Sequence, residues 1–222
     1  MESSPSYKPS RVYRAYSHGE LIADGVVHAA ALVAGLIGFS LLFQRIALYG
    51  GPADGAAIGV YAATFFLVFG FSCAYNMTPP SRAKWLLRRF DHASIFLMIG
   101  GTYTALLSQA YFAIWTVALA ATVWTSALAG ALVKLFLPAR FDRASIAVYL
   151  ALGWLSLVAI KPLMGALPAG TLALVAAGGA LYSMGVAFHL WESLKYQNVL
   201  WHLCVAVAAV CQFAGVFWAV GR

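Results

Sequence analysis

Three ionisable side chains near the start of the chain recur at four-residue intervals: Glu20, Asp24 and His28. Residues four apart lie on one side of an α-helix, with a drift of about 40° per step, so the three are expected to form a stripe. Two carboxylates and an imidazole on one face can relay a proton, bind a metal ion or anchor a hydrogen-bond network. These are the first candidates for a functional site.

Other polar side chains stand near the ends of three further apolar segments. Ser72 and Asn76 are one helical turn apart, Asp91 opens a segment, and Asn198 and His202 are again one turn apart. If the segments alternate in direction, all of these side chains meet at one end of a helical bundle. Ionisable groups within a bilayer are costly unless they are paired or hydrated, so such a gathering predicts a functional site.

The elements that position these residues are predicted to be membrane-spanning helices. Of the 222 residues, 63% are hydrophobic and 9% are charged, whereas soluble domains have roughly 25% charged residues. The sequence therefore predicts an all-α integral membrane protein, a seven-transmembrane helix bundle formed by residues 20–222 after a polar tail at 1–19. A helix needs about 20 apolar residues to cross the hydrocarbon, and the expected spans are 21–44, 54–76, 92–109, 112–136, 144–161, 168–190 and 199–220.

The basic residues predict how the bundle is oriented. Most of the 14 Lys and Arg residues lie in the N-terminal tail and in the connections on the same side, while Arg45, Lys161 and Arg222 lie on the other side. The positive-inside rule then places the N-terminus in the cytoplasm and the C-terminus outside. The basic residues flank apolar segments and form no stripe, so we expect no nucleic-acid partner and expect membrane lipids instead.

Simpler roles compete for several of these side chains. Glu20 is suited to cap the first helix, Asp91 to cap the third, and the Ser72 hydroxyl to bond to its own helix. Asp24 and His28 are different because both are expected to lie within the apolar region. For that pair we favour a role in a site.

Three stretches resemble one family. "RRFDHASIFLMIGGTYTALL", "GELIADGVVHAAALVAG" and "YQNVLWHLCVAVAAVCQF" are similar to the third, first and seventh helices of the hemolysin III proteins, the bacterial branch of the progestin and adipoQ receptor family. The resemblance covers nearly the whole chain. It implies seven helices, a cytoplasmic N-terminus and a multi-pass protein of the bacterial inner membrane. It also implies a zinc ion near the cytoplasmic face, used by some receptor-type members to hydrolyse ceramide-like amides.

The same resemblance assigns site residues position by position. The serine of the family's SxxxH motif is Ser72, the aspartate of the third helix is Asp91, and the second histidine of the HxxxH motif is His202. Asn76 and Asn198 stand where the other two histidines are expected. An asparagine oxygen suits hard cations better than zinc, so zinc as a cofactor is in doubt at this point.

Three functional hypotheses follow. The favoured one is a metal-free polar site for membrane homeostasis or lipid sensing, held together by hydrogen bonds among five side chains: Glu20, Asp24, His28, Asn76 and Asn198. The alternative is a metal-dependent hydrolase of lipid amide or ester bonds. The least favoured is a pore-forming cytolysin, because the opposite half offers no ring of polar side chains.

The hydrolase hypothesis requires a rebuilt zinc site. His202 and His28 would supply nitrogen ligands, and Asp24 or Asp91 would supply oxygen. Asp91 and Ser72 are the candidate catalytic residues. A metal held in this way lowers the pKa of bound water for attack on a lipid amide or ester.

Overall fold

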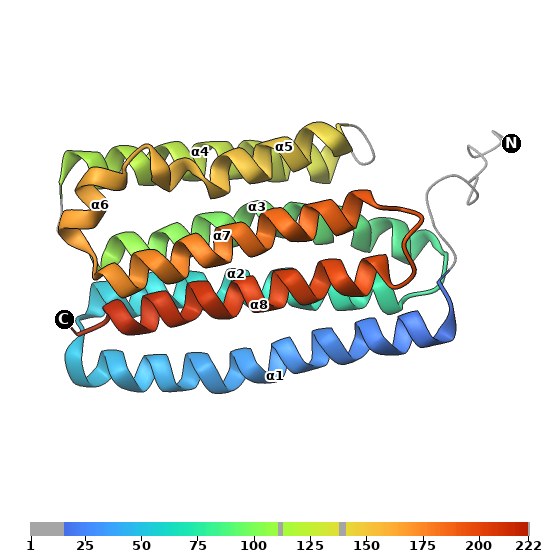
Figure 1. Cartoon of the computed structure of the whole chain (residues 1–222), viewed down its shortest axis with the longest axis horizontal. Helices are drawn as coiled ribbons and strands as arrows, with labels where there is room; N and C mark the ends of the chain where they lie inside the picture. Colours follow the sequence, from blue (N-terminus) through green and yellow to red (C-terminus); the bar gives the residue numbers. More distant parts are fainter. Residues whose placement is uncertain (1–15, 111–112, 138–140, 222) are drawn as a thin grey trace, which may run out of the picture.

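The computed structural model describes residues 16–110, 113–137 and 141–221, which fold as eight α-helices and one 3-10 turn with no strand among them (Figure 1). This confirms the predicted all-α class. The elements are α1 (His18–Tyr49), α2 (Pro52–Met77), α3 (Arg82–Ser108), α4 (Ile114–Phe136), α5 (Asp142–Gly153), η2 (Leu155–Leu157), α6 (Ile160–Ala166), α7 (Ala169–Leu190) and α8 (Gln197–Ala219).

The long helices lie side by side along the longest axis of the molecule (Figure 1). α2 packs along α3, α7 along α8 and α3 along α4, while α1 packs against both α2 and α8. α1 begins at the end of the bundle where α2 finishes and α8 starts; the C-terminus lies at the opposite end. This alternation of direction brings three distant segments together at one end.

A single face of α1 is buried. Its buried residues recur every three or four positions, as the 3.6-residue period of a helix requires, and the rest of the helix exposes side chains such as Val26 and Leu36. The stripe is polar at its start and apolar beyond it: Glu20, Asp24, His28, Ala31, Gly35, Phe39, Leu42 and Ile46. The predicted stripe of Glu20, Asp24 and His28 is therefore the polar end of the packing face of α1.

Five helices are long and apolar enough to cross a membrane: α1, α2, α4, α7 and α8. The segment from α5 to α6 makes a sixth if its two parts are one span. The protein is thus a multi-pass membrane protein with a helical bundle. α3 is not among these five, because its first turns carry several charged side chains.

The predicted fifth span, 144–161, is not one continuous helix. α5 ends at Gly153, a 3-10 turn follows, and α6 leaves at an angle of 56°. Pro162 explains the break, because proline has no N–H to donate and its ring clashes with the carbonyl four residues earlier. The Tyr103 hydroxyl bridges the break: it accepts a hydrogen bond from Ser156 N (2.7 Å) and donates one to Leu152 O (3.0 Å).

The third helix begins about ten residues earlier than predicted. The Ser81 hydroxyl caps α3 by accepting a hydrogen bond from Lys84 N at 3.1 Å, and the helix runs on through the basic residues to Ser108. Asp91 therefore lies inside α3 and does not cap it. The turn chemistry at Ser81 outweighs the polar character of the residues that follow.

Candidate functional site

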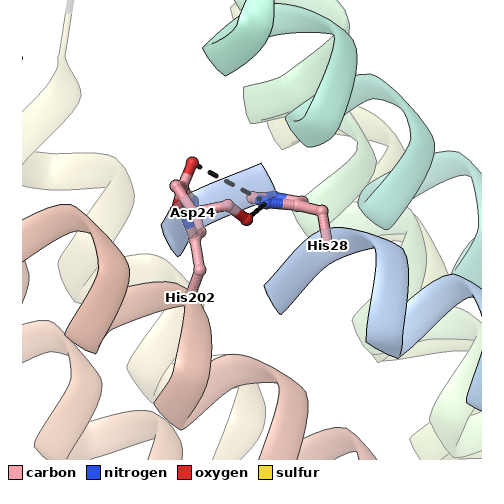
Figure 2. A group of neighbouring side chains, drawn as sticks. All are labelled: Asp24, His28 and His202. Carbon is pink, nitrogen blue, oxygen red and sulfur yellow. Dashed lines mark hydrogen bonds and ion pairs between the residues drawn. The ribbon is translucent and has the colours of Figure 1, made fainter. Parts of the chain in front are cut away.

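Asp24, His28 and His202 meet at the end of the bundle where α1 begins and α8 starts, and their side chains point toward one another (Figure 2). All three are buried, with exposed fractions of 2%, 1% and 7%. Each offers one nitrogen or oxygen atom, and these atoms lie within 4.8 Å of one another. Residues far apart in the sequence thus form one compact group.

The carboxylate of Asp24 fixes the ring of His202. Asp24 Oδ1 is 2.5 Å from His202 Nδ1, which acts as the donor toward the carboxylate. His202 Nε2 then carries a lone pair, and it lies 3.3 Å from the hydroxyl oxygen of Ser72 on α2. The His202 ring is therefore held at both nitrogens, between α1 and α2.

His28 is held at one nitrogen only. Its Nδ1 is 2.8 Å from the backbone oxygen of Asp24, one helical turn earlier, and so donates to it. Its Nε2 is buried and has no hydrogen-bond partner among the described residues. The rings of His28 and His202 lie edge to face, with centroids 4.5 Å apart. A buried polar atom without a partner costs about 1–3 kcal/mol, and this nitrogen is free to bind a ligand.

Asn76 and Asn198 support the group from outside. Asn198 Nδ2 donates to Asn76 Oδ1 at 3.1 Å and lies 3.4 Å from Asp24 Oδ2. Asn76 Nδ2 donates to the backbone oxygen of Ser72 at 2.8 Å. The two amides link α2 to α8 and orient the neighbours of His202 instead of replacing an imidazole as a nitrogen ligand.

Asp91 is buried and adjoins the group without belonging to it. Its carboxylate faces the Ser72 hydroxyl and interacts electrostatically with His202. One of its oxygens is 3.9 Å from Nε2 of His92. Of the two carboxylates considered as oxygen ligands, Asp24 is therefore the one placed with both histidines.

Glu20 has a separate structural role. Its carboxylate accepts hydrogen bonds from the backbone N–H and the hydroxyl of Ser17, both at 2.9 Å, and completes a capping box at the start of α1. Its other oxygen accepts from Tyr196 N at 3.0 Å. Glu20 thus fixes the start of α1 beside the start of α8, which sets the position of the Asp24–His202 pair.

For Lys84, which lies in this region, the sequence predicts only a role in membrane topology. Its ammonium group donates to the backbone oxygens of Tyr75 (2.9 Å), Asn76 (3.4 Å) and Thr78 (2.8 Å). These carbonyls end α2, where a cation is favourable. The sequence signal for this capping role is a lysine that follows shortly after the Pro79–Pro80 turn at the end of α2.

The donor set fits a zinc ion. Two imidazole nitrogens and one carboxylate oxygen are common zinc ligands, and three of them leave a fourth position open. Both Nδ1 atoms are hydrogen-bonded to oxygens of Asp24, an arrangement that fixes the ring orientation of metal-bound histidines.

Comparisons with known proteins identify the family of the chain. The sequence model of the family described as "Haemolysin-III related" matches residues 17–213. "Hemolysin-3" of Bacillus cereus is 33% identical over 201 residues, which cover 90% of this chain and 92% of that protein. "Hemolysin-3 homolog" of Bacillus subtilis (strain 168) is 29% identical over 194 residues, or 87% of this chain and 91% of that protein. The chain belongs to the haemolysin III family of membrane proteins.

Proposed function

We propose that the bundle crosses the bacterial inner membrane seven times, with α3 and the broken α5–α6 segment as single spans in addition to the five apolar helices. The 27-residue length of α3 and its packing between α2 and α4 support this count. The charge distribution supports a cytoplasmic N-terminus and an external C-terminus. The polar site then lies on the cytoplasmic side. The test is a reporter that works only in the cytoplasm, fused to the C-terminus. Activity of this fusion would contradict the proposed topology.

Within that topology, we infer that the protein serves membrane homeostasis or lipid sensing through a metal-binding polar site. The observation that carries this inference is the buried Nε2 atom of His28, which lacks a partner among the described residues and adjoins His202 and Asp24. In the metal-free form of the hypothesis, no described side chain satisfies this nitrogen. A metal ion accounts for it, and zinc is the best match for two imidazoles and a carboxylate.

The residues around the three ligands hold the site in shape. Asp24 orients His202, the Asp24 backbone oxygen orients His28, and Asn198 ties Asp24 to Asn76 on α2. A shift of α1 relative to α8 would alter the contacts of Asp24 with His202 and with Asn198 together. In this topology the exposed face of α1 contacts membrane lipids, so a change in bilayer packing would act on α1 and through it on the site.

The test of this role is membrane order in living cells. Cells lacking the native protein would express the wild type, His28→Ala, His202→Ala or His18→Ala, and the order of the bilayer would be followed with a fluorescent lipid probe. His18 is an exposed histidine in the first turn of α1 and serves as the control. We expect the wild type and His18→Ala to change membrane order to the same extent. Cells with either site variant should have the same membrane order as cells that express none of these proteins. Equal effects of all four proteins would exclude the site from this role.

A second candidate function is hydrolysis of lipid amide or ester bonds. The observation in its favour is the Ser72 hydroxyl, 3.3 Å from His202 Nε2, with the Asp91 carboxylate facing it. A zinc ion with an open position lowers the pKa of its bound water to about 7. Asp91 would accept the proton released during attack and return it to the leaving amine or alcohol as the C–N or C–O bond breaks, and Ser72 would orient the lipid carbonyl. Release of fatty acid from a ceramide-like amide by the wild type, lost in Asp91→Asn, would support it; no release from any such lipid or ester would contradict it.

A cytolytic pore is supported least, although relatives carry the name hemolysin. In the half of the bundle away from the site, aromatic rings fill the space between α1, α2 and α8. Phe39 packs against Tyr61, Phe65 and Phe213 with ring centroids 5.1–5.4 Å apart. The seam is therefore filled mainly by aromatic rings, which do not suit the polar lining of a conduit.

A further inference from the structure

A cavity of about 50 Å³ lies at the end of the bundle opposite the polar site. It is enclosed by the second half of α3, by α4, by the break between α5 and α6, and by the first half of α7. Its lining is almost wholly apolar and includes Leu107, Leu119, Leu163 and Val175. A small apolar crevice thus lies beside the break in the fifth span.

The polar groups at the crevice already have partners. The Tyr103 hydroxyl is used by Ser156 N and Leu152 O, and the indole N–H of Trp154 donates to Ser183 Oγ at 3.0 Å. A polar occupant would therefore lose its hydrogen bonds to water without regaining them here. The crevice selects for hydrocarbon.

The rim of the crevice is open to the outside of the bundle. Leu157 and Ile160 both line the cavity and are 52% and 37% exposed. In a protein that spans the membrane, the phase next to such exposed apolar side chains is lipid. An apolar cavity of about 150 Å³ holds benzene, so the smaller crevice admits only a short segment of a linear chain.

We propose that this crevice binds one acyl chain of a membrane phospholipid, inserted at the break between α5 and α6. This site lies far from Asp24, His28 and His202 and requires no metal. Binding there would stabilise the bent form of the span, because the chain fills the space that bending opens. The proposal goes beyond the function assigned to the polar site.

Two glycines of the broken span provide a matched pair of variants. A Cβ atom added at either Gly153 or Gly165 meets nothing within 4 Å, so a side chain fits at both positions. Gly153 lines the crevice and Gly165 does not. Gly153→Leu should therefore fill the crevice, whereas Gly165→Leu should leave it open. Ala176→Leu fills it from the α7 side and gives an independent second test.

The experiment uses the full chain in detergent micelles, titrated with a phosphatidylglycerol that carries a photoactivatable diazirine in one acyl chain. Labelled peptides are mapped by mass spectrometry after irradiation. We expect saturable labelling of residues 154–163 and 172–179, unchanged in Gly165→Leu and about tenfold weaker in Gly153→Leu and Ala176→Leu at the same lipid concentration.

Two outcomes would overturn the proposal. Labelling that rises without saturation would mean that the lipid only coats the surface. Labelling that is equal in the wild type and in both crevice variants, with each variant folded by its thermal unfolding curve, would mean that the crevice holds no chain. Neither outcome bears on the metal site, which the titration does not involve.

Discussion

His202 Nδ1 lies 2.5 Å from Asp24 Oδ1, although the two residues are 178 positions apart in the chain. This contact joins the first helix to the last and fixes the ring of a histidine whose other nitrogen faces Ser72. A carboxylate that orients an imidazole in this way typically tunes it as a metal ligand or as a base. The site is therefore built around this pair.

Asp24→Asn should weaken zinc binding by about 10- to 100-fold or more, because the variant loses the charge of the oxygen ligand, which also orients and polarises His202. Asp91→Asn should change the affinity by less than about threefold, because Asp91 lies outside the group of three. Competition with a chromophoric chelator in detergent measures both affinities. A larger loss in Asp91→Asn than in Asp24→Asn would reverse the assignment of the oxygen ligand.

Asn76→His combined with Asn198→His should bind zinc at least about tenfold tighter than the wild type, because two imidazoles would join a group that now has two. The two asparagine side chains already touch, at 3.1 Å, and each lies within one turn of a site residue. The same chelator titration measures the gain. An affinity equal to that of the wild type would mean that positions 76 and 198 do not face the bound metal.

Tyr103→Phe should destabilise the protein by about 1–3 kcal/mol, because it leaves Ser156 N and Leu152 O without their bridge at the break between α5 and α6. Tyr61→Phe is the matched control: the hydroxyl of Tyr61 is buried and has no partner among the described residues. Its loss should be neutral or slightly stabilising. Unfolding in mixed micelles compares the two; equal losses of stability would contradict this account of the break.

Lys84→Met should cost about 1.5–3 kcal/mol of stability, because the charged hydrogen bonds to the last carbonyls of α2 are lost. Arg82→Met, two residues earlier at an exposed position of the same helix, should change stability by less than about 0.5 kcal/mol. Both variants remove one positive charge, so a general effect of charge would lower the stability of both variants equally. That result would exclude Lys84 as the cap of α2.

Much of the arrangement around the site follows from sequence periodicity. The four-residue spacing of Glu20, Asp24 and His28 predicts one helical face, and alternating helices bring Ser72 and His202 to the same end of the bundle. These features depend only on the period and direction of helices. They could be predicted without knowledge of any tertiary contact.

Other features depend on how the helices are rotated and on local turn chemistry. Whether Asp24 or Asp91 lies with the histidines is set by the rotation of α3 relative to α1, which apolar periodicity in a membrane protein defines weakly. The early start of α3 follows from the cap at Ser81, and the break near Pro162 divides a stretch of uniformly apolar composition. The crevice beside that break could not be predicted from composition at all.

The most direct test of the account is the metal content of the protein purified without chelators, measured by inductively coupled plasma mass spectrometry. We predict stoichiometric zinc in the wild type and in His18→Ala, and its loss in His28→Ala and His202→Ala. The absence of any transition metal from the wild type, or the same zinc content in all four proteins, would contradict a metal centre at Asp24, His28 and His202.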